Sequence, residues 1–167
     1  MNKKVLIIYT GGTIGMKRTD SGYAPVKGYI EGAIKAIPDL SSPSMPHWDL
    51  HEMDTLLDSS DMTVSEWNHI GKIVYDSYHE YDGFVILHGT DTMAYSASAL
   101  SFMIEGLTKP VIFTGSQLPI GVPRTDGKEN LISAVEIAAA KDEDGNAIVP
   151  EVCICFDNVL MRGNRAS

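Results

Sequence analysis

The sequence has little positive charge, few cysteines and no long hydrophobic run, and each scarcity argues against a class of protein. Lysine and arginine number 13 against 22 aspartates and glutamates, which gives a formal net charge of -9. Nucleic acids and anionic membranes bind basic faces, so we expect neither as a partner. The longest early apolar run, residues 5–9, is too short to cross a bilayer. The first residues also lack a secretory n-region and cleavage site, so we expect a cytoplasmic protein.

Metal-binding spacings are missing as well. Cys153 and Cys155 stand two apart in a strand-like run, so they share one face and are poorly placed to bridge each other. With no second pair elsewhere, the C-x-C pattern favours two buried thiols over a zinc site. Four histidines show no metal-ligand spacing with carboxylates, so we expect no metal: His47, His51, His69 and His79.

What the sequence does contain is an alternation of short hydrophobic runs and helical patterns. The expected strands are residues 5–8, 47–53, 83–87, 111–113 and 152–156. The expected helices are residues 30–37, 63–81, 91–104 and 126–138, with capping boxes starting at Thr63 and Asp126. We expect a mobile loop over residues 15–27 and a loop over residues 161–167. This order predicts one α/β domain over residues 1–167, a mostly parallel, doubly wound, Rossmann-like three-layer sandwich.

Two similar segments follow the first and third of these strands. Thr10-Gly11-Gly12-Thr13-Ile14-Gly15 ends the first, and His88-Gly89-Thr90-Asp91-Thr92-Met93 ends the third. Glycines let the backbone approach a ligand and leave N–H groups facing it, while a threonine hydroxyl can act as a nucleophile. Right-handed crossovers bring both segments to one edge of the sheet, together with residues 58–61 and Ser116.

Other interpretations of these residues remain open. A threonine needs a base or a proton-sharing network, and His88 is the nearest candidate, although a backbone-bonded histidine explains it equally well. Asp91 suits a helix N-cap as well as a ligand contact, and the two roles are compatible. Asp and Ser are also ordinary turn residues. The first segment has Thr10 where dinucleotide-binding loops need glycine and lacks a P-loop lysine, so nucleotide binding is a minor alternative.

These segments carry a resemblance to the bacterial L-asparaginase family. Residues 7–15 and 83–93 resemble its two signature segments, and residues 58–62 and 124–127 resemble further landmarks. The absence of a signal peptide makes the cytoplasmic type I branch the closest match. The resemblance implies hydrolysis of the L-asparagine side-chain amide to L-aspartate and ammonia, without cofactor or metal. It also implies a homo-oligomer, a dimer or tetramer, when the protein is full length.

The resemblance also implies roles for individual residues. Thr13 matches the nucleophile that forms an acyl-enzyme, and Tyr23 matches a tyrosine that hydrogen-bonds this hydroxyl. Thr90 matches a group that helps to activate hydroxyl or water, and Asp91 also meets the substrate α-amino group. The remaining positions bind the substrate α-carboxylate and amine or stabilise the oxyanion through the backbone. The binding residues are Asp58, Ser59 and Ser60, with Ser59 the main carboxylate contact, and the oxyanion groups are N–H groups near Gly12, Thr90 and Ser116.

The sequence departs from the family pattern at its end. Family members carry a lysine shortly after the strand expected at 152–156 and a smaller C-terminal domain, whereas the last lysine here is Lys141. We therefore expect these residues to be the N-terminal domain of a longer enzyme, weakly active or inactive alone. Three alternatives stay open: a glutaminase-asparaginase, a tRNA-dependent amidotransferase subunit and a non-catalytic amino-acid-binding domain. A one-methylene difference between asparagine and glutamine is worth only about 1–3 kcal/mol and depends on pocket shape.

Overall fold

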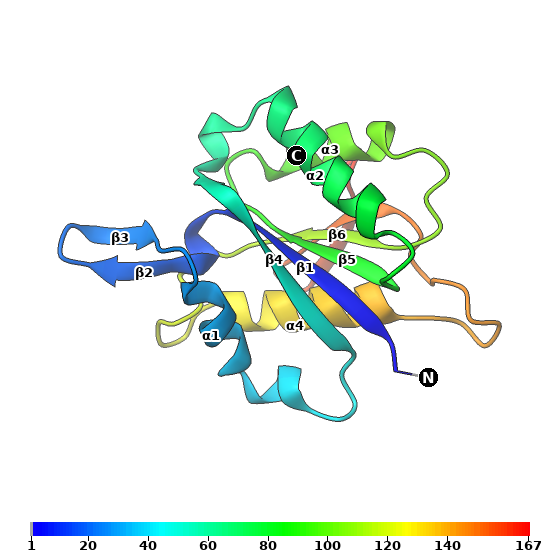
Figure 1. Cartoon of the computed structure of the whole chain (residues 1–167), viewed down its shortest axis with the longest axis horizontal. Helices are drawn as coiled ribbons and strands as arrows, with labels where there is room; N and C mark the ends of the chain where they lie inside the picture. The colour runs from blue at the N-terminus through cyan, green and yellow to red at the C-terminus, as the bar shows by residue number, and fades with distance from the viewer. Residues whose placement is uncertain (1) are drawn as a thin grey trace.

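The computed structural model describes residues 2–167, and a six-stranded sheet forms their centre (Figure 1). The strand order is β4-β1-β5-β6-β7-β8. Five strands are parallel and β8 pairs antiparallel with β7. The expected mostly parallel, doubly wound architecture is therefore confirmed. The strands are β1 (Lys4–Gly11), β4 (His47–Leu57), β5 (Gly83–Leu87), β6 (Val111–Thr114), β7 (Val152–Phe156) and β8 (Val159–Arg162).

Helices cover both faces of this sheet (Figure 1). One face carries α1 (Tyr29–Lys35) and α4 (Gly127–Ala139), and the other carries α2 (Val64–Ser77) and α3 (Met93–Met103). In β1, Val5, Ile7 and Tyr9 pack with the first pair of helices, while Leu6 and Ile8 pack with the second. Because both faces of the inner strands β5 and β6 are buried, their sequences contain almost only apolar residues, whereas the edge strand β4 is largely polar. Residues 2–167 also contain three short 3-10 helices: η1 (Thr13–Gly15), η2 (Pro38–Ser41) and η3 (Ser59–Asp61).

The two segments expected as loops, residues 15–27 and 161–167, both contain strand residues. Residues 16–25 form β2 (Met16–Thr19) and β3 (Gly22–Pro25), an antiparallel ribbon that projects from the body (Figure 1). Its side chains are mostly exposed, so it lacks the hydrophobic alternation that marks a half-buried strand. The second hairpin joins β7 to β8 through Asp157 and Asn158, which have φ values of 51° and 61°. Two such residues between paired strands form the preferred tight turn, and the Asp-Asn pair was the signal for it.

Helix capping also differs from expectation at two of three positions. The capping box at Thr63 is present, because its hydroxyl accepts from Ser65 N at 3.3 Å and Glu66 accepts from Thr63 N at 2.9 Å. Asp126 makes no such bond, since its carboxylate instead accepts from the backbone of residues 117 and 118. Asp91 lies one residue before the α3 N-cap, Thr92, so the helix begins later than expected. The Asp91 carboxylate is therefore left out of helix capping.

Cys153 and Cys155 are free and buried, as the C-x-C pattern predicts. Burial raises the pKa of the Cys153 thiol to about 11 and also raises the pKa of Cys155. Residues 2–167 contain no cluster of three or more His, Cys, Asp or Glu side chains that could hold a metal ion. Within the same range, every helix is too short or too polar to span a membrane.

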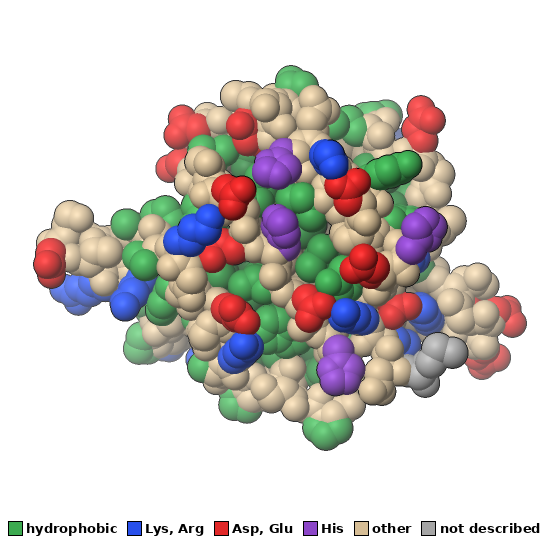
Figure 2. All heavy atoms as spheres, viewed as in Figure 1, with side chains coloured by type: hydrophobic (Ala, Val, Ile, Leu, Met, Phe, Trp, Pro, Cys, Tyr) green, Lys and Arg blue, Asp and Glu red, His purple; other side chains and the backbone are tan. Residues whose placement is uncertain are grey.

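Charged side chains of both signs are mixed on the surface. On the face shown in Figure 2, lysines and arginines stand singly among aspartates and glutamates. Two exposed pairs lie at the β4 edge of the sheet, Lys4 with Asp49 at 3.0 Å and Lys27 with Asp54 at 3.5 Å. Exposed pairs of this kind contribute about 0–1 kcal/mol to folding, so they do not single out a functional surface.

One partly buried ion pair gives a testable pH dependence. Asp82 accepts from Lys4 N at 2.7 Å and pairs with Lys141, so it ties the start of β5 to β1 and to the end of α4. Burial alone would raise the pKa of Asp82, but these bonds outweigh it and lower the pKa. A lowered pKa stabilises the fold above the unfolded-state pKa, and this stabilisation is lost as pH falls through the folded-state pKa.

We therefore expect Asp82→Asn to destabilise the protein by about 1 kcal/mol at pH 7. The difference should approach zero at the lowest pH at which both proteins stay folded, because the wild-type carboxyl is then protonated. Urea unfolding at the two pH values measures it. An equal difference at both would show that the charge of Asp82 contributes nothing.

Candidate active site

The polar segments that the sequence singled out lie in order along one edge of the sheet. Because β4, β1, β5 and β6 are parallel neighbours, their carboxyl ends present residues 58–60, 12–13, 89–91 and 115–116 side by side. Adjacent strands are about 4.8 Å apart. The chain leaves β1 on one side to form β4 and returns on the other side as β5. This reversal is the switch point at which open α/β sheets bind ligands.

Glycines bring three of these segments into direct contact. A Cβ atom added to Gly12 would lie 2.6 Å from Gly89 N, so the backbones after β1 and β5 touch. A Cβ on Gly89 would lie 2.7 Å from Ser59 Oγ, which brings the β4 loop to the same point. Thr92 adds a further link, because its hydroxyl donates to Ser59 O at 2.6 Å. Thr13 and Thr90 are therefore attached to backbones in van der Waals contact.

Hydroxyl groups near this edge divide into two sets. Four hydroxyls donate hydrogen bonds to backbone carbonyl oxygens: Thr10 to Leu87, Thr92 to Ser59, Thr114 to Cys155 and Ser116 to Leu118. Among residues 2–167, by contrast, no hydrogen bond occupies the hydroxyls of Thr13, Ser59 or Thr90, and none occupies the Asp91 carboxylate. Thr13 and Thr90 are partly exposed and Asp91 is exposed. The unoccupied set is thus available to a ligand.

Backbone donors are free at the same place. The N–H groups of Gly12, Gly89 and Thr90 have no hydrogen-bond partner within the part of the chain that the structure describes. Gly12 has φ 92° and ψ 169°, a conformation that glycine adopts most easily. Free donors beside free hydroxyls suit an oxygen that gains negative charge.

Asp58 and Ser60 are placed differently from Ser59. The Asp58 carboxylate accepts from Ser60 N and Ser60 Oγ, both at 3.1 Å, and so caps η3. Both side chains are exposed, whereas Ser59 is 2% exposed. The capping interpretation of Asp58 therefore holds, and its second carboxylate oxygen has no partner among residues 2–167.

Tyr23 lies away from the other candidates. It sits in β3, opposite Arg18, and its side chain is 50% exposed. No hydrogen bond joins it to Thr13 in the region that the structure describes. The projecting hairpin would have to fold toward the strand ends for Tyr23 to reach the Thr13 hydroxyl (Figure 1).

His88 is satisfied inside the fold and does not face the site. It is 1% exposed, with Nδ1 2.6 Å from Gly89 O and Nε2 2.8 Å from Ser96 Oγ. Burial lowers the pKa of His88, which favours the neutral imidazole. A buried histidine with both nitrogens engaged does not act as the base for Thr13. The backbone-bonded alternative is the one that the structure supports, and sequence reasoning missed its partner Ser96.

Lys141, the last lysine of the chain, does not supply a cation here either. Lys141 bonds to Asp82 at the opposite edge of the sheet, where β5 begins. The Ser116 hydroxyl is also committed, since it donates to Leu118 O at 2.5 Å. Ser116 thus has only its backbone N–H left to donate to an oxyanion.

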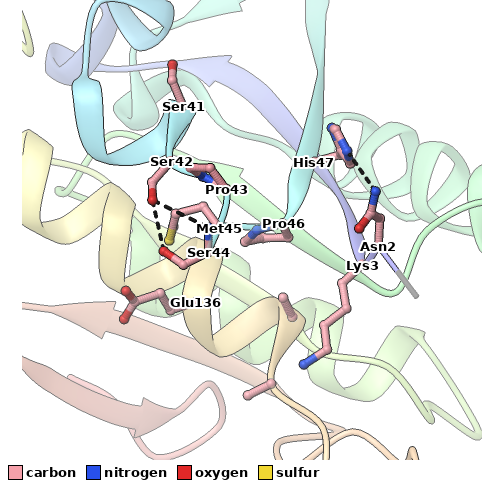
Figure 3. Close-up of a pocket in the computed structure, with 12 residues that line it drawn as sticks. Asn2, Lys3, Ser41, Ser42, Pro43, Ser44, Met45, Pro46, His47 and Glu136 are labelled. Carbon is pink, nitrogen blue, oxygen red and sulfur yellow. Dashed lines mark hydrogen bonds between the residues drawn. The ribbon is translucent and has the colours of Figure 1, made fainter.

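Two cavities lie near the sheet edges. One of about 690 Å³ opens beside Thr90 and Asp91 and is also lined by Gln117. The other, about 810 Å³, lies at the opposite edge, where β1 and β4 begin, among Lys3, Ser44 and Glu136 (Figure 3). It contains none of the predicted site residues. Its polar side chains are partly paired with each other, Ser42 with Ser44 and Asn2 with His47.

The fold and this edge define a doubly wound α/β domain with a hydroxyl-lined site at its switch point. Comparison with known sequences and structures agrees, because the family model described as "Asparaginase, N-terminal" matches residues 4–167. The chain belongs to this family. It has the same α/β fold as L-asparaginase I from Vibrio cholerae, with a TM-score of 0.90 and 49% identity over 100% of this chain and 48% of that one.

Curated relatives include two L-asparaginases. L-asparaginase 1 of Escherichia coli K12 is 50% identical over 165 residues, which cover 99% of this chain and 47% of the relative. L-asparaginase of Dirofilaria immitis is 46% identical over 186 aligned residues, which cover 96% of this chain and 30% of the relative. The chain thus spans about half or less of the length of the relatives that it matches.

Proposed function

We propose that this chain provides the nucleophile and the substrate-binding loops of an enzyme that hydrolyses L-asparagine to L-aspartate and ammonia. One observation carries the proposal: three unoccupied hydroxyls and one unoccupied carboxylate stand at adjoining strand ends that glycines hold in contact. The asparaginase names of the relatives agree with it. A domain that only binds an amino acid does not need two threonine hydroxyls without hydrogen-bond partners on adjacent backbone segments.

In this mechanism the Thr13 hydroxyl attacks the side-chain amide carbon, and its proton passes to the network around Thr90 and Asp91. The N–H groups of Gly12 and Thr90 donate to the oxygen that becomes negative, each worth about 3 kcal/mol in the transition state. The C–N bond breaks, the nitrogen takes up a proton and leaves as ammonia. Water aided by the Thr90 hydroxyl then attacks the acyl-enzyme and releases aspartate.

Substrate orientation comes from two neighbouring groups of this edge, one suited to each charge of the amino acid. The α-carboxylate meets the Ser59 hydroxyl and the η3 backbone, with Asp58 and Ser60 shaping that loop. The α-ammonium meets the Asp91 carboxylate. Tyr23 reaches the Thr13 hydroxyl only when the β2–β3 hairpin closes over the site, so hairpin closure precedes chemistry.

We further propose that turnover needs residues in addition to these 167, because the relatives are two to three times as long. The family resemblance supplies the candidates: a lysine that completes a Thr-Asp-Lys group and a smaller second domain. It also supports a homo-oligomer located in the cytoplasm. The experiments below on activity therefore use the full-length protein.

Ammonia release from matched substrates tests the proposal. L-Asparagine should be hydrolysed. L-Glutamine is the comparison substrate, because a glutaminase or an amidotransferase subunit would hydrolyse it instead. Succinamic acid, which lacks the α-amino group, should be a poor substrate. Asp91→Asn should lower kcat on both substrates, because Asp91 also belongs to the proton network. It should raise the KM for L-asparagine about 10- to 100-fold, the loss of one charge-assisted bond, and should change the KM for succinamic acid much less. No ammonia from any of the amides would refute the proposal, and an equal change of KM for L-asparagine and succinamic acid would refute the contact between Asp91 and the α-ammonium group.

A further inference from the structure

A series of hydrogen bonds runs from α2 through α3 to the loop after β5. Trp67 Nε1 donates to Ser96 Oγ at 2.8 Å, Ser96 Oγ lies 2.8 Å from His88 Nε2, and His88 Nδ1 lies 2.6 Å from Gly89 O. The direction is fixed at both ends, because an indole N–H only donates and a carbonyl oxygen only accepts. His88 therefore carries its proton on Nδ1, and Nε2 of the neutral ring accepts the Ser96 hydroxyl proton.

This series determines how one peptide unit is oriented. Gly89 C=O and Thr90 N–H belong to the same planar unit, and none of the described peptide bonds is cis. In a trans unit the two groups point in opposite directions. The bond from His88 holds Gly89 O toward the buried ring, so Thr90 N–H points away from it. That N–H has no partner among residues 2–167, and the Thr90 and Asp91 side chains that follow it are partly exposed and exposed, respectively.

Among residues 2–167, no other hydrogen bond reaches Gly89 O. Position 89 must be glycine, because an added Cβ would meet Ser59 atoms at 2.7–2.8 Å. Glycine leaves the backbone free to rotate, and a rotated unit would turn Thr90 N–H out of the site. The imidazole of the preceding residue supplies the constraint that a side chain at position 89 cannot supply.

We propose that His88 is a positioning residue for amide hydrolysis, and that its neutral Nδ1–H form holds Thr90 N–H ready to donate to the developing oxyanion. The Gly89 carbonyl selects this tautomer, and the Ser96 hydroxyl, which accepts from Trp67, satisfies Nε2. The inference rests on the proposed function, since only an acyl-transfer reaction develops the oxyanion. A donor that is fixed beforehand stabilises the transition state more than the ground state, so its loss lowers kcat and leaves KM nearly unchanged.

A series of variants in the full-length protein tests this role. His88→Leu keeps an apolar side chain of similar size and removes the bond to Gly89 O, so kcat should fall about 100-fold with KM within about threefold. His88→Asn places an amide N–H near the Nδ1 position and should keep kcat within about fivefold of wild type. Ser96→Ala leaves the buried Nε2 without its partner and loosens the ring, so kcat should fall about tenfold. Trp67→Phe is the control and should stay within about twofold, because the Ser96 bond to His88 remains.

Two measurements distinguish a positioning role of His88 from a purely structural one. Thermal unfolding should show each variant folded at the assay temperature, and ¹⁵N spectra of wild-type imidazoles should show His88 in the Nδ1–H form. The Nε2–H form would overturn the inference whether or not the variants fold. Equal losses in the Leu and Asn variants, or a loss confined to KM, would also overturn it. A wild-type protein that hydrolyses no asparagine would instead overturn the proposed function, whatever the spectra show.

Discussion

Thr13→Ala is expected to abolish ammonia release while the protein stays folded and still binds the product. The Thr13 hydroxyl has no hydrogen-bond partner among residues 2–167, so its removal leaves no buried group unsatisfied. The free energy of unfolding should therefore change by about 0.5 kcal/mol or less. The reaction loses its nucleophile, so kcat should fall about 10⁴-fold or more. Ammonia assays, thermal unfolding and calorimetric titration with L-aspartate measure the three quantities.

A matched control lies three residues earlier in the same segment. Thr10 is 1% exposed and its hydroxyl donates to Leu87 O at 2.8 Å, so it joins β1 to β5 without facing the site. Thr10→Val should cost about 1–2 kcal/mol of stability and leave kcat within about threefold. Thr13→Ala protein that keeps a tenth or more of the wild-type kcat would contradict the assignment of the nucleophile. Full retention of both binding and turnover would make a different hydroxyl the nucleophile.

The fold could be predicted from the sequence wherever burial is complete. Residues 83–87 and 152–156 form strands with the expected bounds, because an apolar run buried on both faces has no other stable place. Hairpin strands at the surface could not be predicted this way. Residues 16–25 fold by pairing with each other, and β8 folds by pairing with β7, so neither needs a hydrophobic pattern of its own.

Candidate site positions could also be predicted, but their chemical state could not. Ser59 and Ser116 look alike in the sequence, since each follows an expected strand of the same sheet. Only the structure distinguishes them, because the Ser116 hydroxyl is bonded to Leu118 O and the Ser59 hydroxyl is unoccupied. The position of His88 was evident, but its dependence on Ser96, eight residues away in the next helix, was not. Such pairings depend on tertiary packing, which no local spacing encodes.

Gly12→Ala is expected to impair both stability and catalysis, because the two strand ends can meet only without a side chain there. The added Cβ would lie 2.6 Å from Gly89 N and 2.7 Å from Gly89 Cα, and backbone atoms cannot rotate aside. The residue also has φ 92° and ψ 169°, which costs a residue with a side chain about 1–3 kcal/mol. Overpacking adds about 1–3 kcal/mol, so we expect a total loss of about 2–6 kcal/mol.

Relief of that overlap has to move Thr13 and Thr90 apart, and a displacement of about 1 Å at reacting groups lowers the rate about 100-fold. Any folded Gly12→Ala protein should therefore show kcat reduced by at least that factor. Gly32→Ala is the matched control, because Gly32 lies in α1 with open space around it and should gain up to about 1 kcal/mol of stability. Urea unfolding and ammonia release compare the two variants. Wild-type stability and turnover in Gly12→Ala would mean that contact between the β1 and β5 ends does not position the two threonines.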